Sequence, residues 1–257
     1  MQALNLALVQ TALNWEERDK NLAMFEEKLK QVYDDRDIIV LPEVFTTGFS
    51  MNVEKLGEPM DGGSMQWMKE KAREKNAVIT GSLIIKENNK YYNRLIWMPP
   101  DGNYKHYDKR HLFVMAKEDH YFTHGAGKLI TEWKGWKLCP LICFDLRFPA
   151  FVRNQEYYDA MICVANWPAK RSNHWRSLLP ARAIENQCYV AAVNRVGPDG
   201  NKIDHRGDSC VIDPMGETNL SAAWEENILN ATLHKENIEK TRRYMPFLED
   251  QDQYRLF

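Results

Sequence analysis

The sequence predicts an α/β protein, and two patterns support this prediction. Short apolar runs recur along the 257 residues, and several are bounded by Gly, Pro, Asn or Asp, as strands usually are. Between them lie stretches in which apolar residues recur at helical spacing. Strands that alternate with helices indicate an α/β architecture. Because no internal repeat, low-complexity tract or Gly/Ser linker interrupts the chain, we predict one continuous domain over residues 1–257.

The predicted strands differ in their expected burial. Residues 38–41 and 160–165 are apolar on both faces, which is typical of strands inside a sheet that is covered on both sides. In all, strands are expected at residues 4–10, 37–41, 77–85, 91–98, 136–142, 160–165 and 188–194.

Three helices are predicted between these strands. Asn14 followed by Glu17 resembles a capping box, and a stripe of apolar residues at positions 22, 25, 29 and 32 continues from it. Further helices are expected at residues 64–75 and 173–187. The last residues, 241–257, mix charge with aromatic side chains, so we expect this tail to dock, with a second subunit as the candidate partner.

The bulk composition is that of an ordinary globular protein. Hydrophobic residues make up 44% of the chain, charged residues 27%, and the formal net charge is −2. No general attraction for nucleic acid or an anionic membrane follows from that balance. No apolar run approaches the roughly 20 residues that a membrane span needs.

The five cysteines predict a reducing environment. Their number is odd, and none forms a C-x-x-C pair, so no disulfide framework is implied. The first ten residues lack the basic start of a signal peptide. We therefore expect a cytoplasmic protein.

Cys143 is the first candidate for chemistry. It follows the predicted strand 136–142 and precedes a probable turn into a helix, which puts its sulfur at the carboxyl end of a sheet, where ligands gather. A nearby helix N-terminus or cation favours the reactive thiolate. The N–H of Phe144 would also point where an oxyanion can form. The alternative is one more buried core cysteine.

Glu43 and Lys109 are the next candidates. Glu43 follows the apolar strand 37–41, where a carboxylate needs partners and can act as a general base; the alternative is a loop carboxylate that faces solvent. Lys109 can serve as a fixed cation opposite the oxygen of a tetrahedral intermediate. The alternative for Lys109 and Arg110 is a solvated charge pair.

The histidines suggest an alternative kind of active site. His120 and His124 have the i,i+4 spacing that can share a metal on a helix, but residues 122–127 look like a loop and no H-E-x-x-H is present. A histidine could instead activate Cys143, as in thiol proteases. Because of that loop and the missing H-E-x-x-H we expect no metal, and because no glycine pattern typical of phosphate binding occurs we expect no cofactor.

Three segments together resemble the nitrilase superfamily of carbon–nitrogen hydrolases. The resemblance covers residues 4 to about 234. Its motifs are LPEVFTTGF at residues 41–49, YDKRHLF at 107–113 and ICFDLRFP at 142–149. Two further short motifs, ANWPA at 165–169 and HRGDS at 205–209, are similar to those of bacterial omega-amidases. Those enzymes hydrolyse the terminal amide of 2-oxoglutaramate or 2-oxosuccinamate.

The resemblance implies roles for individual residues. Cys143 would be the nucleophile, Glu43 the general base, and Lys109 the oxyanion stabiliser together with the Phe144 N–H. Glu118 best matches the second glutamate of the family, ahead of Asp119. Phe144 stands where a tyrosine is usual, which matters little for a role of the backbone.

The resemblance also implies the architecture and the reaction. The family fold is a four-layer αββα sandwich, usually paired into homodimers, and the reaction is hydrolysis of a small amide through a thioester. Alternatives are a nitrile or a carbamoylated amine as substrate, or a non-catalytic binding scaffold that would have no need of Glu43, Lys109 and Cys143 together.

A 2-oxo dicarboxylate substrate requires a cation or several hydrogen-bond donors for its carboxylate. The candidates are Arg147, Lys170, Arg171 and Arg195, and Arg147 could equally be a structural partner of an acid such as Asp145. Trp167 and Phe49 could form apolar pocket walls or pack in the core.

Overall fold

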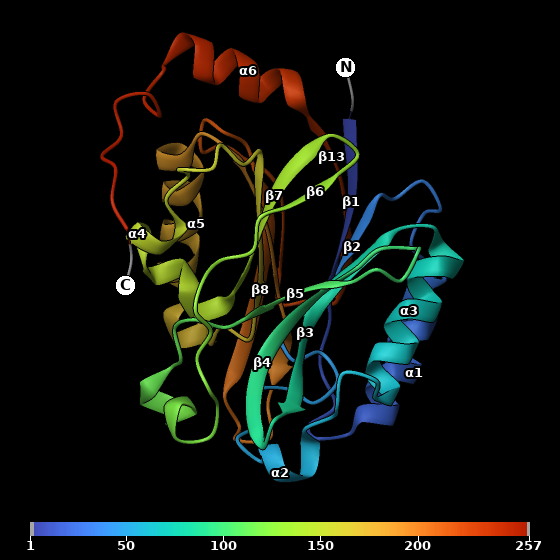
Figure 1. The fold of residues 1–257 in the computed structure, drawn as a ribbon. Helices are drawn as coiled ribbons and strands as arrows, with labels where there is room; N and C mark the ends of the chain where they lie inside the picture. Colours follow the sequence, from blue (N-terminus) through green and yellow to red (C-terminus); the bar gives the residue numbers. More distant parts are fainter. Residues whose placement is uncertain (1–2, 256–257) are drawn as a thin grey trace.

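The computed structural model describes residues 3–255, in which two β-sheets lie face to face between layers of helices (Figure 1). The first sheet has the order β13–β1–β2–β3–β4–β5. Its strands are β1 (Ala3–Gln10), β2 (Ile38–Val40), β3 (Val78–Glu87), β4 (Lys90–Met98), β5 (Lys105–Asp108) and β13 (Asn227–His234).

The second sheet has the order β10–β11–β9–β8–β7–β6, with β12 paired to β11. Its strands β7, β8 and β9 run parallel to one another. The strands are β6 (Thr131–Trp133), β7 (Trp136–Ile142), β8 (Ala160–Ala165), β9 (Tyr189–Asn194), β10 (Val196–Pro198), β11 (Asp204–Ile212) and β12 (Thr218–Ala223).

Alternating side chains divide the first sheet between two cores. Leu4, Leu6 and Leu8 on β1 join the core shared with the second sheet, whereas Ala7 and Val9 join the core under the helices on the other side. Successive side chains of a strand point to opposite faces, so β1 serves both layers at once.

Helices cover the outer face of each sheet, which gives the predicted four-layer αββα sandwich (Figure 1). On the first sheet lie α1 (Arg18–Leu29) and α3 (Gly63–Lys75), which contribute Phe25 and Met68 to that core. On the second sheet lies α5 (Ser172–Asn186), which contributes Trp175. The α/β prediction is confirmed.

The first helix begins later than its predicted cap. Glu17 is the N-cap residue of α1 and makes no side-chain cap, so the capping box expected at Asn14 is wrong. Asn14 is instead held by Asn21, whose Oδ1 accepts its backbone N–H at 2.8 Å.

The chain ends in a helix, α6 (Lys235–Tyr244), and a tail that runs from α6 to the vicinity of α4 (Pro149–Val152) (Figure 1). The helix α6 takes in the first residues of the predicted tail, and residues 256–257 lie outside the described part. Near α4, Tyr254 Oη donates a hydrogen bond of 2.5 Å to the Ala150 carbonyl. Docking on a second subunit stays a prediction.

Short helical segments complete the chain and connect the layers. None of the helices among residues 3–255 combines the length and apolar character needed to cross a membrane. The segments are α2 (Val53–Leu56) and the 3₁₀ turns η1 (Val114–Ala116), η2 (Glu118–His120), η3 (Cys143–Arg147) and η4 (Ala169–Arg171).

Candidate active site

A cavity of about 530 Å³ opens where the chain leaves the carboxyl ends of β2, β7 and β8. Ligands gather at this edge of parallel strands. The residues singled out from the sequence that line it are Glu43, Phe49, Lys109, Cys143, Phe144, Arg147, Trp167 and Arg171.

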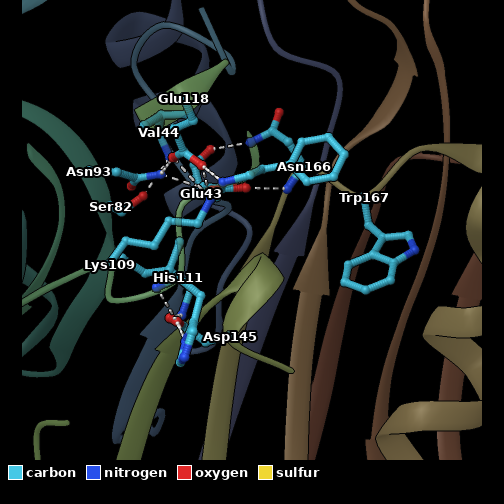
Figure 2. A network of polar contacts seen from close by, with 12 residues as sticks. Glu43, Val44, Ser82, Asn93, Lys109, His111, Glu118, Asp145, Asn166 and Trp167 are labelled. Atoms are coloured by element: carbon cyan, nitrogen blue, oxygen red, sulfur yellow. Dashed lines mark hydrogen bonds and ion pairs between the residues drawn. The ribbon is translucent and has the colours of Figure 1, made fainter. Parts of the chain in front are cut away.

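Glu43 lies buried just beyond β2, with both carboxylate oxygens engaged (Figure 2). Its Oε1 accepts hydrogen bonds from Asn93 Nδ2 and Lys109 Nζ, each at 2.9 Å. Its Oε2 accepts the Asn166 backbone N–H at 2.8 Å. The alternative of a solvent-facing loop carboxylate is wrong.

Lys109 lies between two carboxylates (Figure 2). Its ammonium donates to Glu43 Oε1 at 2.9 Å and to both oxygens of Glu118 at 3.0 Å. Burial alone would lower the pKa of Lys109, but the charges of Glu118 and Glu43 outweigh it and hold that pKa above its usual range. Lys109 is therefore a fixed buried cation, and the solvated charge pair is wrong for it.

Glu118 completes the charged cluster from η2. It is fully buried, and its Oε2 also accepts the Phe113 N–H at 2.6 Å. Burial, together with the charge of Glu43, raises the pKa of Glu118 although Lys109 opposes the shift. The neighbouring Asp119 keeps 39% of its side chain exposed, so the structure brings Glu118 and not Asp119 to Lys109.

Cys143 lies at the end of β7 in a left-handed backbone conformation, with φ of +44°. Such a conformation costs a non-glycine residue about 1–3 kcal/mol and is common at functional sites. Burial and the charge of Glu43 raise the pKa of the Cys143 thiol well above its ordinary value, against the opposing effect of Lys109. Unlike the enclosed Cys139 and Cys163, Cys143 lines the cavity, so it is not simply a core cysteine.

Two arginines, Arg147 and Arg171, line the same cavity. Arg147 donates a hydrogen bond to His174 Nδ1 at 3.1 Å and lies over the Trp167 ring, with its guanidinium carbon 4.6 Å from the ring centroid. Burial and the nearby charge of Arg171 lower the pKa of Arg147. Among residues 3–255 neither guanidinium pairs with a carboxylate, and the structural pairing of Arg147 with Asp145 is wrong.

The two remaining cation candidates do not line the cavity. Arg195 is fully buried and donates to backbone carbonyls, including that of Pro198 at 2.8 Å. Lys170 lies in η4 outside the cavity lining.

Trp167 and Phe49 combine both of their predicted roles. Each lines the cavity, while Trp167 also packs on Trp175 at 5.3 Å between ring centroids. The centroid of the Phe49 ring lies 5.0 Å from Lys109 Nζ. Both are therefore pocket walls, Trp167 is a core residue as well, and Phe49 packs against a small core cluster that includes Val44.

Sequence reasoning missed two asparagines of the charged cluster (Figure 2). Asn166 belongs to the ANWPA word but was given no role, and its side chain also donates to the Glu43 carbonyl at 2.6 Å. Asn93 lies inside β4, where the sequence carries no signal that it bonds to Glu43.

His120 and His124 do not lie on one helix, which the metal alternative requires. His120 ends η2 and His124 follows in a loop, so the two do not share a helical face. Within the described residues, no group of three His, Cys, Asp or Glu side chains is arranged to hold a metal ion. His205 does line the cavity, but burial and the charge of Arg195 lower its pKa to about 4, so it is neutral near pH 7.

Comparison with known proteins is consistent across sequence and structure. The family model for carbon–nitrogen hydrolases matches residues 5–243. The chain is 43% identical over 258 residues to the omega-amidase YafV of Escherichia coli strain K12, with 100% of each covered. It is 31% identical over 250 residues to a 2-oxoglutaramate amidase of Bacillus subtilis, covering 95% of this chain and 96% of the relative.

Solved structures show the same similarity. A CN-hydrolase superfamily protein of Xanthomonas campestris, with an arsenic adduct in its active site, superposes with a TM-score of 0.98 at 39% identity and full coverage of both chains. Nit3 of Saccharomyces cerevisiae, from branch 10 of the nitrilase superfamily, gives a TM-score of 0.85 at 27% identity, with 95% of each chain covered.

Proposed function

The chain belongs to the carbon–nitrogen hydrolase family, and from this premise we propose that it is a cysteine amidase of the omega-amidase type. Its substrate would be a small 2-oxo dicarboxylate monoamide, either 2-oxoglutaramate or 2-oxosuccinamate, and its product ammonia. One observation carries the proposal: the buried Glu43–Lys109–Glu118 cluster adjoins Cys143 at a cavity that also presents Arg147 and Arg171, neither of which pairs with a carboxylate in the described part of the chain.

In the first half-reaction, Cys143 attacks the amide carbon. Glu43 takes the thiol proton as the sulfur–carbon bond forms, because the raised pKa of Cys143 keeps the free enzyme in the thiol form near pH 7. Lys109 and the Phe144 N–H stabilise the developing oxyanion. That N–H lies in the first turn of η3, where backbone N–H groups have no partner within the helix. The carbon–nitrogen bond then breaks, and Glu43 returns the proton to the departing ammonia.

In the second half-reaction, water replaces the sulfur. Glu43 takes a proton from water while its oxygen attacks the thioester carbon, and the same oxyanion donors act again. The carbon–sulfur bond breaks, the thiol regains its proton, and the carboxylic acid leaves. Every group in this scheme belongs to the chain itself, so the proposal requires no metal or cofactor.

The substrate carboxylate would bind Arg147 and Arg171. Burial and, to a smaller extent, the charge of Arg171 lower the pKa of Arg147, and an anion between the two guanidiniums would remove their mutual repulsion. Arginine also suits carboxylates geometrically, because its planar guanidinium can donate two parallel hydrogen bonds. The two amidase relatives, an omega-amidase and a 2-oxoglutaramate amidase, support the same substrate class.

The test is ammonia release from a panel of candidate substrates by wild type and by Cys143→Ala. The panel contains 2-oxoglutaramate, 2-oxosuccinamate, glutamine, asparagine, a carbamoylated amine and a simple nitrile. We expect fast release from the 2-oxo amides only, abolished in the variant. Release from another panel member alone would replace the substrate, and equal release by Cys143→Ala would refute the nucleophile.

A further inference from the structure

Asp145 is fully buried two residues after Cys143 and does not line the cavity. Its Oδ1 accepts hydrogen bonds from the His111 backbone N–H at 3.0 Å and from His111 Nδ1 at 2.8 Å. Its Oδ2 accepts from the Tyr107 hydroxyl at 2.8 Å and from the Ile142 N–H at 3.2 Å. The carboxylate is thus saturated by protein donors and is not free to exchange protons with a substrate.

These donors come from the two segments that carry the proposed nucleophile and cation. Ile142 ends β7 directly before Cys143. Tyr107 and His111 stand two residues before and two residues after Lys109. In Figure 2, Asp145 and His111 lie together on one side of Lys109. A single carboxylate therefore joins the turn of Cys143 to the segment of Lys109.

The donors on the Lys109 side are themselves held in place. The Tyr107 hydroxyl accepts the Arg110 N–H at 3.0 Å, so it is fixed from both sides. The His111 ring stacks on Phe148 with centroids 3.7 Å apart and an interplanar angle of 8°. Phe148 ends the turn that Cys143 begins, so the stacking is a second contact between the same two segments.

We propose that Asp145 is a positioning residue that sets the separation between Cys143 and Lys109 in the reaction. The inference rests on the proposed function, in which Lys109 stabilises the oxyanion formed by Cys143. A displacement of about 1 Å between reacting groups can cost about 100-fold in rate. A structural residue would alter stability alone, whereas a positioning residue alters the chemical step at unchanged substrate affinity.

The decisive variant is Asp145→Asn, which keeps the volume but places an amide NH₂ where two donors now point to one oxygen. We expect kcat to fall about 100-fold with KM changed less than about twofold. Alkylation of Cys143 by iodoacetamide forms no oxyanion and needs no Lys109, so its rate should change less than about threefold. The split between turnover and alkylation is the signature of positioning.

Asp159→Asn is the matched control. Asp159 is also buried, accepts the Lys137 N–H at 2.9 Å, and lies at the opposite ends of β7 and β8, away from the cavity. We expect Asp159→Asn and Asp145→Asn both to lower the midpoint of thermal unfolding. The kcat of Asp159→Asn should stay near that of wild type. Tyr107→Phe removes one donor without adding an NH₂, and should lower kcat in the same way by about tenfold.

Several outcomes would overturn the inference. Wild-type kcat in a folded Asp145→Asn enzyme would do so, as would turnover and alkylation falling by the same factor. If Asp145→Asn does not fold, Tyr107→Phe decides by the same comparison. A wild-type enzyme that releases no ammonia from any amide would instead refute the proposed function, so the two failures are distinguishable.

Discussion

Lys109 carries its charge between Glu43 and Glu118, and this arrangement predicts what its loss would do. Lys109→Met removes a proposed oxyanion donor, so turnover should fall about 100- to 1,000-fold. It also leaves two buried carboxylates without their cation, which should cost about 3–5 kcal/mol of stability. Ammonia release and urea unfolding measure the two effects.

Lys71 provides the control for that experiment. It is also buried and binds two carboxylates, Glu26 at 2.8 Å and Glu74 at 3.0 Å, but on α3 and away from the cavity. Lys71→Met should lower stability and leave kcat unchanged. An equal loss of kcat in both variants would mean that Lys109 acts through stability alone.

The Cys143 thiol predicts an unusual pH dependence. Burial and the charge of Glu43 raise its pKa, so the thiolate fraction grows with pH and stays small near neutrality. Alkylation by iodoacetamide should therefore keep accelerating above pH about 8.5, where an ordinary cysteine begins to level off. Glu43→Gln removes the second cause of the shift, so its alkylation should level off at lower pH. A wild-type plateau below pH about 8.5 would contradict this.

Most of the site could be predicted at the level of single residues, because its charged members fall in short motifs. Glu43, Lys109 and Cys143 each belong to such a segment, whereas Glu118 was matched only through the resemblance to the family. Asn93 could not be found, since an asparagine inside a strand gives no sign of the residue it will bond to 50 positions away. The same holds for Asp145, whose partners Tyr107 and His111 are defined only by the packing of two sheets.

The elements of the fold carry their own prediction at the end of α3. Asn76 is its C-cap residue and adopts a left-handed conformation with φ of +47°. Glycine adopts this conformation without steric cost, whereas alanine is strained by about 1–2 kcal/mol. Asn76→Ala should therefore be clearly less stable than Asn76→Gly in urea unfolding, with ammonia release unchanged in both. Equal stability of the two variants would show that the cap is not under strain.

Strands were predictable where their sequence is mainly apolar. The strands β2, β7, β8 and β9 are mainly apolar and were predicted to within about one residue. The strands β5, β6 and β10–β13 were missed, because they are short, polar or partly exposed and their patterns do not differ from those of loops. The sequence likewise carries no sign that the Asn14 N–H bonds to the side chain of Asn21, so the start of α1 was predicted too early.

At the scale of the whole molecule, we expect a homodimer that uses the face around α6. Tyr244 is 82% exposed and Phe247 54%, and two large aromatic side chains exposed three residues apart make this face a candidate contact surface. Light scattering should give twice the mass of one chain, and Tyr244→Ser with Phe247→Ser should reduce it toward the monomer. Tyr33→Ser, at a tyrosine 63% exposed elsewhere, should not. A monomeric wild type would exclude the pairing.

The prediction of one continuous domain belongs to the same scale. The interior core takes side chains from both sheets and from α5, so neither sheet buries its inner face without the other. A single unfolding transition should follow, measured by circular dichroism and by tryptophan fluorescence together. Two separate transitions would indicate independent units.

The Glu43–Lys109 pair and the nucleophile come from the two different sheets of the sandwich. Glu43 and Lys109 follow strands of the first sheet, while Cys143 and Asn166 follow strands of the second. The spacing of the layers is therefore also the spacing of base and nucleophile. Substitutions that enlarge or shrink side chains between the two sheets, even far from the cavity, should lower kcat before they unfold the chain. The reaction rate therefore reports the spacing between the two sheets.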